Sequence, residues 1–226
     1  MNTPNRNESK YPLAGLIALA LGAIVVTARA DYPSQILADG PLLYYRLNEN
    51  ITLGTFDTAT NRGTVGTGAN GLYTTVTHGV AGIPGASGNS AINIPGAGNM
   101  QVAYNPALNQ AGAFTAEFWT RPGGGSSCPF NSVDFGAAQR TGWLIYQDTI
   151  VAGNWTFRVY KTGGANVQIS GGTTTQGVWH HVVGVFDSNT NLSLYVDGVL
   201  AVGPTPLAGD QTPMANPAIP LSLGIR

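Results

Sequence analysis

The stretch Val178–Leu200 constrains the fold more than any other segment, because it reads as three short strands joined by two turns. Val178–Phe186 is rich in β-branched and aromatic residues, and Leu192–Val196 alternates Leu, Ser, Leu, Tyr and Val after a polar loop. The pair Asp197-Gly198 supplies the positive φ angles that a two-residue primed turn requires, so the strand Val199–Val202 returns antiparallel. The segment therefore predicts an antiparallel β-meander.

The rest of the chain carries strand patterns and no helical periodicity after its first thirty residues. Gly-rich segments such as Thr64–Gly71 and Gly82–Ser90 separate the patterns and predict loops. The predicted strands ahead of the meander are Leu42–Leu47, Leu72–Val76, Ala91–Ile94, Met100–Ala103, Phe114–Arg121, Trp143–Gln147, Trp155–Lys161 and Val167–Ser170. The chain is expected to be an all-β protein.

Four segments carry a family resemblance: Pro41–Glu49 (PLLYYRLNE), Phe114–Pro122 (FTAEFWTRP), Trp179–Gly198 and Pro220–Gly224 (PLSLG). Their order and spacing resemble the laminin-G-like domains of the concanavalin A-like lectin/glucanase superfamily, from about Tyr32 to the C-terminus. The resemblance implies a two-sheet antiparallel jelly-roll sandwich. Because members of this superfamily bind sugars, bind proteins, hydrolyse glycans or hold neighbouring domains, it implies no single function.

The sequence departs from that family at its end. After the PLSLG strand the family continues into a further strand that pairs beside the first, whereas this sequence stops at Ile225-Arg226. We therefore expect a sandwich that lacks its last strand. The strand Leu42–Leu47 would then be an exposed sheet edge.

The first thirty residues form a separate segment. Arg6 and Lys10 precede the apolar run Tyr11–Thr27, and small residues at Ala28 and Ala30 follow it. This pattern predicts a helical secretory signal peptide over residues 1–30, with an uncleaved membrane anchor as the alternative. We expect a secreted, extracellular or cell-surface domain over residues 31–226, with no membrane span after cleavage.

The charge of residues 31–226 excludes one class of partner. Seven basic and ten acidic residues give a net charge near −3, so no basic patch for nucleic acid is expected. Charged residues make up only 9% of the chain, and the surface must be built from Thr, Ser, Asn, Gln and Gly. Cys128 is the sole cysteine and is expected in a loop, as a free thiol or an intermolecular bridge.

Catalysis by paired carboxylates finds little support. Glycosidases use two carboxyl groups that flank one bond, and on a single strand such a pair must be two or four residues apart. Residues 31–226 contain only Glu49 and Glu117 as glutamates, and neither has an acidic partner at that spacing. A pair between Glu117 and Asp148 or Asp197 from distant strands remains open.

The adjacent histidines His180 and His181 point to opposite faces of one strand and cannot chelate one ion together. We expect one ring near the core with its nitrogens satisfied and the other on the open face of the sheet. The alternative is a catalytic histidine, for which the sequence offers no Gly-x-Ser-x-Gly nucleophile motif.

A ligand face is predicted on the strand that begins at Phe114. Phe114, Ala116 and Phe118 would face the core, and the alternating side chains would face outward. An aromatic ring beside polar groups suits a glycan. The candidate ligand-binding residues are Glu117, Trp119, Arg121, Tyr195 and Asp197. The expected partner is a glycan, with an adhesive contact to an extracellular protein as the alternative. The other reading of Trp119 and Tyr195 is a place in the core, and for Trp119 we favour it, because large aromatic side chains are readily buried in such folds.

The resemblance implies one possible cofactor, structural calcium. Glu49, Asp57 and Asp187 offer hard oxygen ligands in loops, and Asn61, Asn189 and Asn191 stand near two of them. The alternative for all of them is turn chemistry, because Asp and Asn side chains cap turns with their own backbone.

Overall fold

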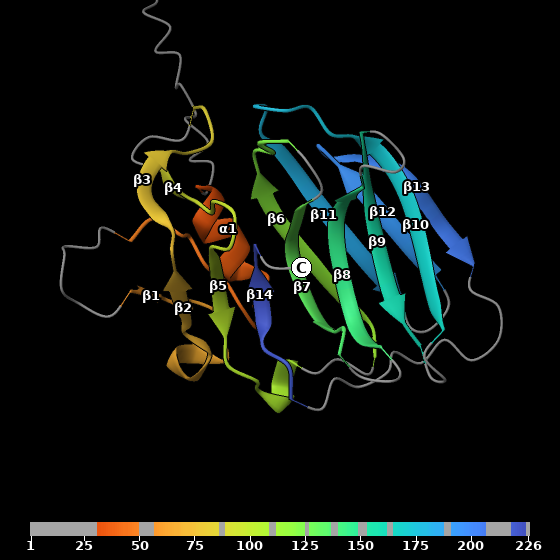
Figure 1. Ribbon diagram of the computed structural model, residues 1–226, viewed down its shortest axis with the longest axis horizontal. Coiled ribbons are helices and arrows are strands. Elements are labelled where there is room, and N and C mark those ends of the chain that lie inside the picture. Colours follow the sequence, from red (N-terminus) through yellow and green to blue (C-terminus); the bar gives the residue numbers. More distant parts are fainter. Residues whose placement is uncertain are drawn as a thin grey trace, which may run out of the picture.

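The computed structural model describes residues 31–49, 57–85, 89–108, 112–124, 127–136, 140–148, 153–161, 165–187, 191–206 and 218–224. The predicted signal peptide over residues 1–30 lies outside them. Two antiparallel sheets are stacked face to face, and a third, two-stranded sheet stands apart at one end (Figure 1). The chain thus forms the predicted jelly-roll sandwich.

The larger sheet has eight strands in the order β1-β2-β5-β14-β7-β8-β9-β10. Its strands are β1 (Thr58–Ala59), β2 (Gly71–Thr74), β5 (Asn99–Val102), β7 (Ser127–Asp134), β8 (Thr141–Asp148), β9 (Asn154–Tyr160), β10 (Asn166–Thr173) and β14 (Leu221–Leu223). The strand patterns predicted six of these eight; β1 and β7 were not predicted.

The smaller sheet has the order β13-β12-β11-β6, and the separate hairpin pairs β3 with β4. The bounds are β6 (Phe114–Thr120), β11 (His180–Asp187), β12 (Asn191–Val196) and β13 (Val199–Pro206), with β3 (Thr77–Ala81) and β4 (Ser90–Asn93). The predicted meander is β11-β12-β13. Asp197 and Gly198 have φ angles of 54° and 78° and join β12 to β13, as the primed turn requires.

The core lies between the two sheets and is built around aromatic side chains. Trp155 and Phe157 of β9 are fully buried, and they meet Phe114 and Phe118 of β6 edge to face across the sandwich. Such contacts add to the stabilisation from burial alone. This core fixes which side of β6 and β11 points to solvent.

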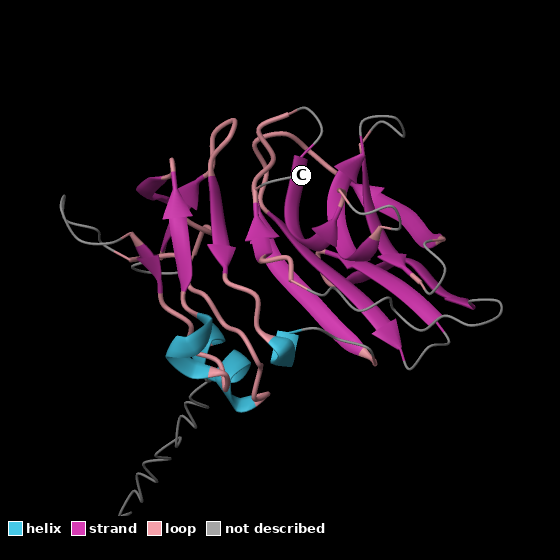
Figure 2. Cartoon of the chain, turned by 60° about the horizontal axis from the view of Figure 1, so that its bottom comes forward, coloured by secondary structure: helices cyan, strands magenta, loops and turns pink. Residues whose placement is uncertain are grey.

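Helical segments are short and were not predicted. They are α1 (Tyr32–Ala38), η1 (Gly66–Ala69) and η2 (Pro106–Leu108), and Figure 2 shows them together along one side of the strands. Asp31 caps α1 by accepting a hydrogen bond from Ser34 N at 3.1 Å. Two turns are too few for a detectable apolar stripe. None of the helices in the described ranges has the length and apolar content needed to cross a bilayer.

The predicted strand Leu42–Leu47 is wrong, because this segment is irregular. The backbone of Tyr44 bonds to a turn instead of a strand: its N–H donates to Asn61 Oδ1 at 2.9 Å, and its carbonyl accepts from Arg62 N. Leu47 has a φ angle of 55°, which breaks extended geometry. The predicted loop around Cys128 is also wrong, since this residue lies in β7.

Candidate functional site

The outer face of the four-stranded sheet carries most of the predicted ligand residues. On β6, Phe114, Ala116 and Phe118 pack into the core, as predicted, and the intervening residues Thr115, Glu117 and Trp119 are exposed. Strand register continues this face onto β11 and β12, where it includes His181, Val183, Val185, Ser193 and Tyr195. We call these eight outward-pointing residues the outer face.

An open hollow of about 460 Å³ lies at one end of the outer face. Tyr195 lines it from β12 together with Ser193, and Thr115 contributes from β6. Asp187 and Asn191, which oppose one another where β11 and β12 meet, bring a carboxylate and an amide. The hollow therefore combines the Tyr195 ring with hydroxyl, amide and carboxylate groups, and the rest of its lining is apolar: Ala113, Phe114, Val185, Phe186 and Pro204.

Trp119 lies on the outer face but outside this hollow. Its indole ring is 36% exposed and stacks on the His181 ring, with centroids 4.9 Å apart and planes at 21°. Its Nε1 donates to the hydroxyl of Tyr32 on α1 at 3.1 Å. Trp119 thus points outward, and the expectation that favoured a place in the core is wrong. One ring face and the N–H are already engaged, and α1 lies beside this end of the sheet.

His181 also faces a carboxylate. Its Nε2 lies 3.8 Å from Glu117 Oε2, on the neighbouring strand and on the same face. This distance is long for a hydrogen bond, and Glu117 is therefore held only loosely.

His180 and Asp197 form a buried structural contact. His180 is 5% exposed, its Nδ1 lies 2.8 Å from Asp197 Oδ2, and its Nε2 accepts from Thr175 N at 3.0 Å. Asp197 Oδ1 also accepts from His181 N at 2.9 Å. Burial alone would raise the pKa of Asp197, but these hydrogen bonds outweigh it and hold the pKa below its ordinary value.

This geometry decides the role of the two histidines. Because Nε2 of His180 is an acceptor, the ring is neutral with its proton on Nδ1, and neither nitrogen is available as a base. The expectation of one satisfied histidine near the core and one on the open face is confirmed. Asp197 serves the turn and does not reach the hollow's lining.

Arg121 lies just past the end of β6 and contacts Trp179. Its guanidinium lies 5.7 Å from the centroid of the Trp179 ring, in a cation–π contact. Of the five predicted ligand residues, the structure thus brings Glu117, Trp119 and Tyr195 onto one face, and only Tyr195 lines the hollow.

The predicted calcium residues do not meet. Glu49 accepts from Tyr73 Oη at 2.8 Å and from Thr60 N at 3.0 Å, whereas Asp57 Oδ1 lies 2.8 Å from Nε2 of His78. Asp187 is on β11 in the other sheet. Within the described ranges, no three His, Cys, Asp or Glu side chains are grouped to hold a metal ion.

The distant carboxylate pairs are not assembled on this face either. Asp148 ends β8 in the eight-stranded sheet, whereas Glu117 points outward from the four-stranded sheet, away from β8. Asp197 is bound to both histidines.

A second face was missed by the sequence analysis. On the outside of the eight-stranded sheet, Leu144 and Tyr146 of β8 pack with Val133 and Tyr160 as a separate buried cluster, with Arg158 beside them. The available signal in the sequence was that Arg158 and Tyr160 are two residues apart and therefore lie on the same face of a strand.

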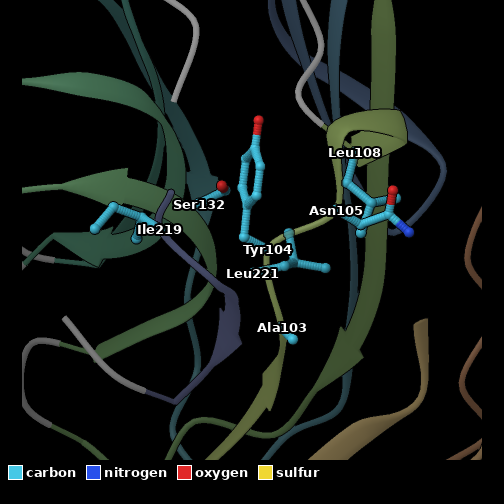
Figure 3. Close-up of a pocket in the computed structure, with 7 residues that line it drawn as sticks. All are labelled: Ala103, Tyr104, Asn105, Leu108, Ser132, Ile219 and Leu221. Carbon is cyan, nitrogen blue, oxygen red and sulfur yellow. The ribbon is translucent and has the colours of Figure 1, made fainter. Parts of the chain in front are cut away.

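A small pocket on the eight-stranded sheet is not a ligand site. Figure 3 shows the ring of Tyr104 standing between Ser132 and Ile219 on one side and Leu108 and Asn105 on the other. The remaining space is about 10 Å³. That volume is close to the minimum needed to hold a single water molecule.

Comparison with known proteins agrees with this architecture. A laminin G-type family model, described as the concanavalin A-like lectin/glucanases superfamily, matches residues 95–224. No curated protein sequence matches the chain.

Solved structures resemble the fold at low sequence identity. The receptor binding domain of botulinum neurotoxin C/D mosaic serotype has 13% identity and a TM-score of 0.54, covering 83% of this chain and 43% of that one. The binding domain of botulinum neurotoxin serotype D has 12% identity and a TM-score of 0.54, covering 83% and 44%. This chain thus spans less than half of these neighbours. With the family match over residues 95–224, the chain belongs to the concanavalin A-like lectin/glucanase superfamily.

Proposed function

We propose that this chain is a noncatalytic recognition module that binds carbohydrate in the hollow of the outer face. The observation that carries the proposal is the hollow itself, where the Tyr195 ring lies among hydroxyl, amide and carboxylate groups. Its volume of about 460 Å³ falls in the range of small-ligand sites, which is roughly 300–1,000 Å³.

The lining matches the chemistry of a sugar. The C–H face of a pyranose is apolar and stacks on an aromatic ring, here Tyr195, and its hydroxyls exchange hydrogen bonds with polar groups at the ring's edge. Ser193 and Thr115 offer hydroxyls that donate and accept, and Asn191 offers an amide that does both. Asp187 adds an acceptor and would disfavour an anionic sugar at this position.

We propose a noncatalytic module because the acidic side chains are not arranged for glycoside hydrolysis. Glycoside hydrolysis needs a general acid and a nucleophile or base that flank one bond. Each Asp197 oxygen already accepts from His180 or His181, and neither Asp197 nor Glu117 belongs to the hollow's lining. Among the described lining residues, Asp187 is the single carboxylate.

The family and the shared fold support recognition in general. The fold is one that toxin binding domains also use, including a receptor binding domain, although identities near 13% transfer no ligand to this chain. Together with the predicted signal peptide, this favours action outside the cell on a polysaccharide or glycoprotein glycan. Whether the chain holds structural calcium is a separate question, which an experiment in the Discussion tests.

A second candidate function is adhesion to a protein. The edge strand β13 exposes Val199 at 67% and Leu200 at 42%, next to the turn that closes the meander. An edge with exposed apolar side chains can accept a strand from a partner. This contact would lie beside the hollow and would not need Tyr195.

A glycan array with the wild-type chain and single variants tests the proposal. We expect Tyr195→Ala to lower the signal for bound glycans about tenfold, which corresponds to a loss of roughly 1.4 kcal/mol. Trp119→Ala should have a smaller effect, because this ring lies outside the hollow.

Tyr104→Ala is the matched control, since Tyr104 is 37% exposed on the other sheet. It should bind like the wild type. If the wild-type chain binds no glycan on the array, the carbohydrate proposal fails and the protein-binding candidate takes its place.

A further inference from the structure

Two arginines lie beside Tyr160 on the outside of the eight-stranded sheet. Arg140 Nη1 donates to Tyr160 Oη at 3.3 Å, and Arg158 stands two residues before Tyr160 on the same face of β9. Arg158 donates from Nε to Gln168 Oε1 at 2.7 Å and from Nη2 to Tyr146 Oη at 2.8 Å. These side chains come from β8, β9, β10 and the residue just before β8.

The two positive charges have no acidic counterpart in the part of the chain that the structure describes. No described carboxylate lies within 4 Å of either guanidinium; the ion pairs there all involve histidine. Two like charges held close together repel each other. The net charge of the whole chain is −1, so this concentration of positive charge is local.

The pKa of Tyr160 reflects the positive charge of the two arginines. Burial alone would raise the pKa of Tyr160, but hydrogen bonds and charges from Arg140 and Arg158 outweigh it and leave the pKa below its ordinary value. A lowered phenol pKa requires a strongly positive surrounding.

Each of the two arginines packs on an aromatic ring. The Arg158 guanidinium lies 5.2 Å from the centroid of the Tyr146 ring, and that of Arg140 lies 5.5 Å from the Phe135 ring. Tyr146 and Tyr160 are 3% and 1% exposed and form part of the separate buried cluster. Arg140 itself is exposed. A guanidinium fixed on a buried ring loses little side-chain entropy when it binds an anion.

We infer that Arg140 and Arg158 form a site for the anionic groups of an acidic glycan, either uronate carboxylates or sulfates. The exposed Arg140 guanidinium is planar and presents parallel N–H groups that match both anions. Arg158, whose Nε and Nη2 already donate to Gln168, adds its positive charge beside it. This inference rests on the proposed carbohydrate binding and places a second, acidic-glycan site on the opposite sheet from the Tyr195 hollow.

The accessible part of this surface is small. The register row through Arg158 runs from Thr58 to Gln168, but its central residues Ser222, Asn131 and Leu144 are at most 5% exposed. Gln168 is exposed beside Arg158 and is the polar neighbour that an anionic group would reach.

Titration calorimetry with two acidic probes tests the inference: a galacturonic acid hexamer and a heparin-derived hexasaccharide. The neutral control is the same galacturonate hexamer with every carboxylate methyl-esterified. We expect the full chain to bind at least one acidic probe, and to bind it more weakly as salt is raised from 50 to 200 mM. Arg140→Gln/Arg158→Gln should bind it at least tenfold more weakly.

Arg62→Gln is the matched control, because it removes one charge from an exposed position between β1 and η1. It should bind like the wild type. If the double variant does not fold, as judged by its thermal melt, Arg140→Gln alone is used, since Arg140 is exposed. Equal affinity of wild type and arginine variant, or no binding of either acidic probe to the wild type, overturns the inference.

The two proposals fail separately. Tyr195→Ala should keep its affinity for the acidic probe, and the arginine variant should keep the glycans that the hollow binds. Loss of acidic-probe binding in Tyr195→Ala would contradict a second site and assign both ligands to the hollow.

Discussion

Asp197 supports the β12–β13 turn through its carboxylate, and Asp197→Asn tests that support. Asn keeps the left-handed backbone geometry that Asp197 adopts at φ 54°, so the turn itself is not strained. His180 Nδ1 and His181 N bind different carboxylate oxygens, however, and the amide replaces one of these oxygens with an NH2 group that cannot accept. One of the two donors must lose its partner.

The magnitude follows from the buried donor. A hydrogen bond to a charged group contributes about 1.5–3 kcal/mol, and the His180 side chain is only 7% exposed, so water cannot replace the lost acceptor. The carboxylate is 49% exposed, which lowers the expected loss toward the middle of that range. We expect the free energy of unfolding to fall by about 2 kcal/mol and the melting temperature by about 4–8 °C.

Urea unfolding followed by tryptophan fluorescence measures this loss, because two of the four tryptophans, Trp143 and Trp155, lie in the core. Asp39→Asn is the control, since Asp39 is exposed after α1, and it should cost less than about 0.5 kcal/mol. A loss below 0.5 kcal/mol for Asp197→Asn would refute the reasoning.

The same contact has a pH dependence of defined sign. The pKa of Asp197 is lowered in the folded chain, so its contribution is complete above the ordinary carboxyl pKa of 3.8 and is lost as the pH falls through the lower folded value. The stability difference between wild type and Asp197→Asn should therefore be full at pH 7 and shrink below about pH 4.

Three further predictions concern the core and the metal. Gly184→Ala should destabilise the fold by about 1–3 kcal/mol in urea unfolding, because the added Cβ would lie 2.8 Å from Ile145 Cδ1. Phe157→Ala should cost about 3–5 kcal/mol by the same measurement, since Phe157 is fully buried, and a loss under 1 kcal/mol would contradict the packing described. Calcium at millimolar concentration, compared with chelator, should leave the melting midpoint unchanged, because Glu49 and Asp57 bind Tyr73 and His78; a rise of several degrees would support structural calcium.

The sequence predicts the meander well because local chemistry specifies it. Alternation along β11 and β12 and the Asp197-Gly198 turn are properties of neighbouring residues, and the register of the structure follows them. The segment Leu42–Leu47 has an equally strong strand composition, but Asn61, seventeen residues away from Tyr44, bonds its backbone. Such a long-range competitor leaves no local signal.

The sequence likewise predicts only part of the candidate site. Periodicity places Glu117 and Trp119 on one face correctly, because side chains alternate along a strand. It gives no indication that Tyr32 binds the Trp119 indole across 87 residues of sequence. The arginine pair was missed because Arg140 and Arg158 meet only through the pairing of β8 with β9.

The central claim is that a neutral glycan binds the outer face of the four-stranded sheet. Amide chemical shifts of the isotope-labelled chain, followed during titration with a neutral oligosaccharide selected on the array, test it most directly. The account predicts that the largest changes cluster at Thr115, Val185, Ser193 and Tyr195. Changes that cluster instead on β7, β8 and β9, or that spread without a cluster, would contradict it.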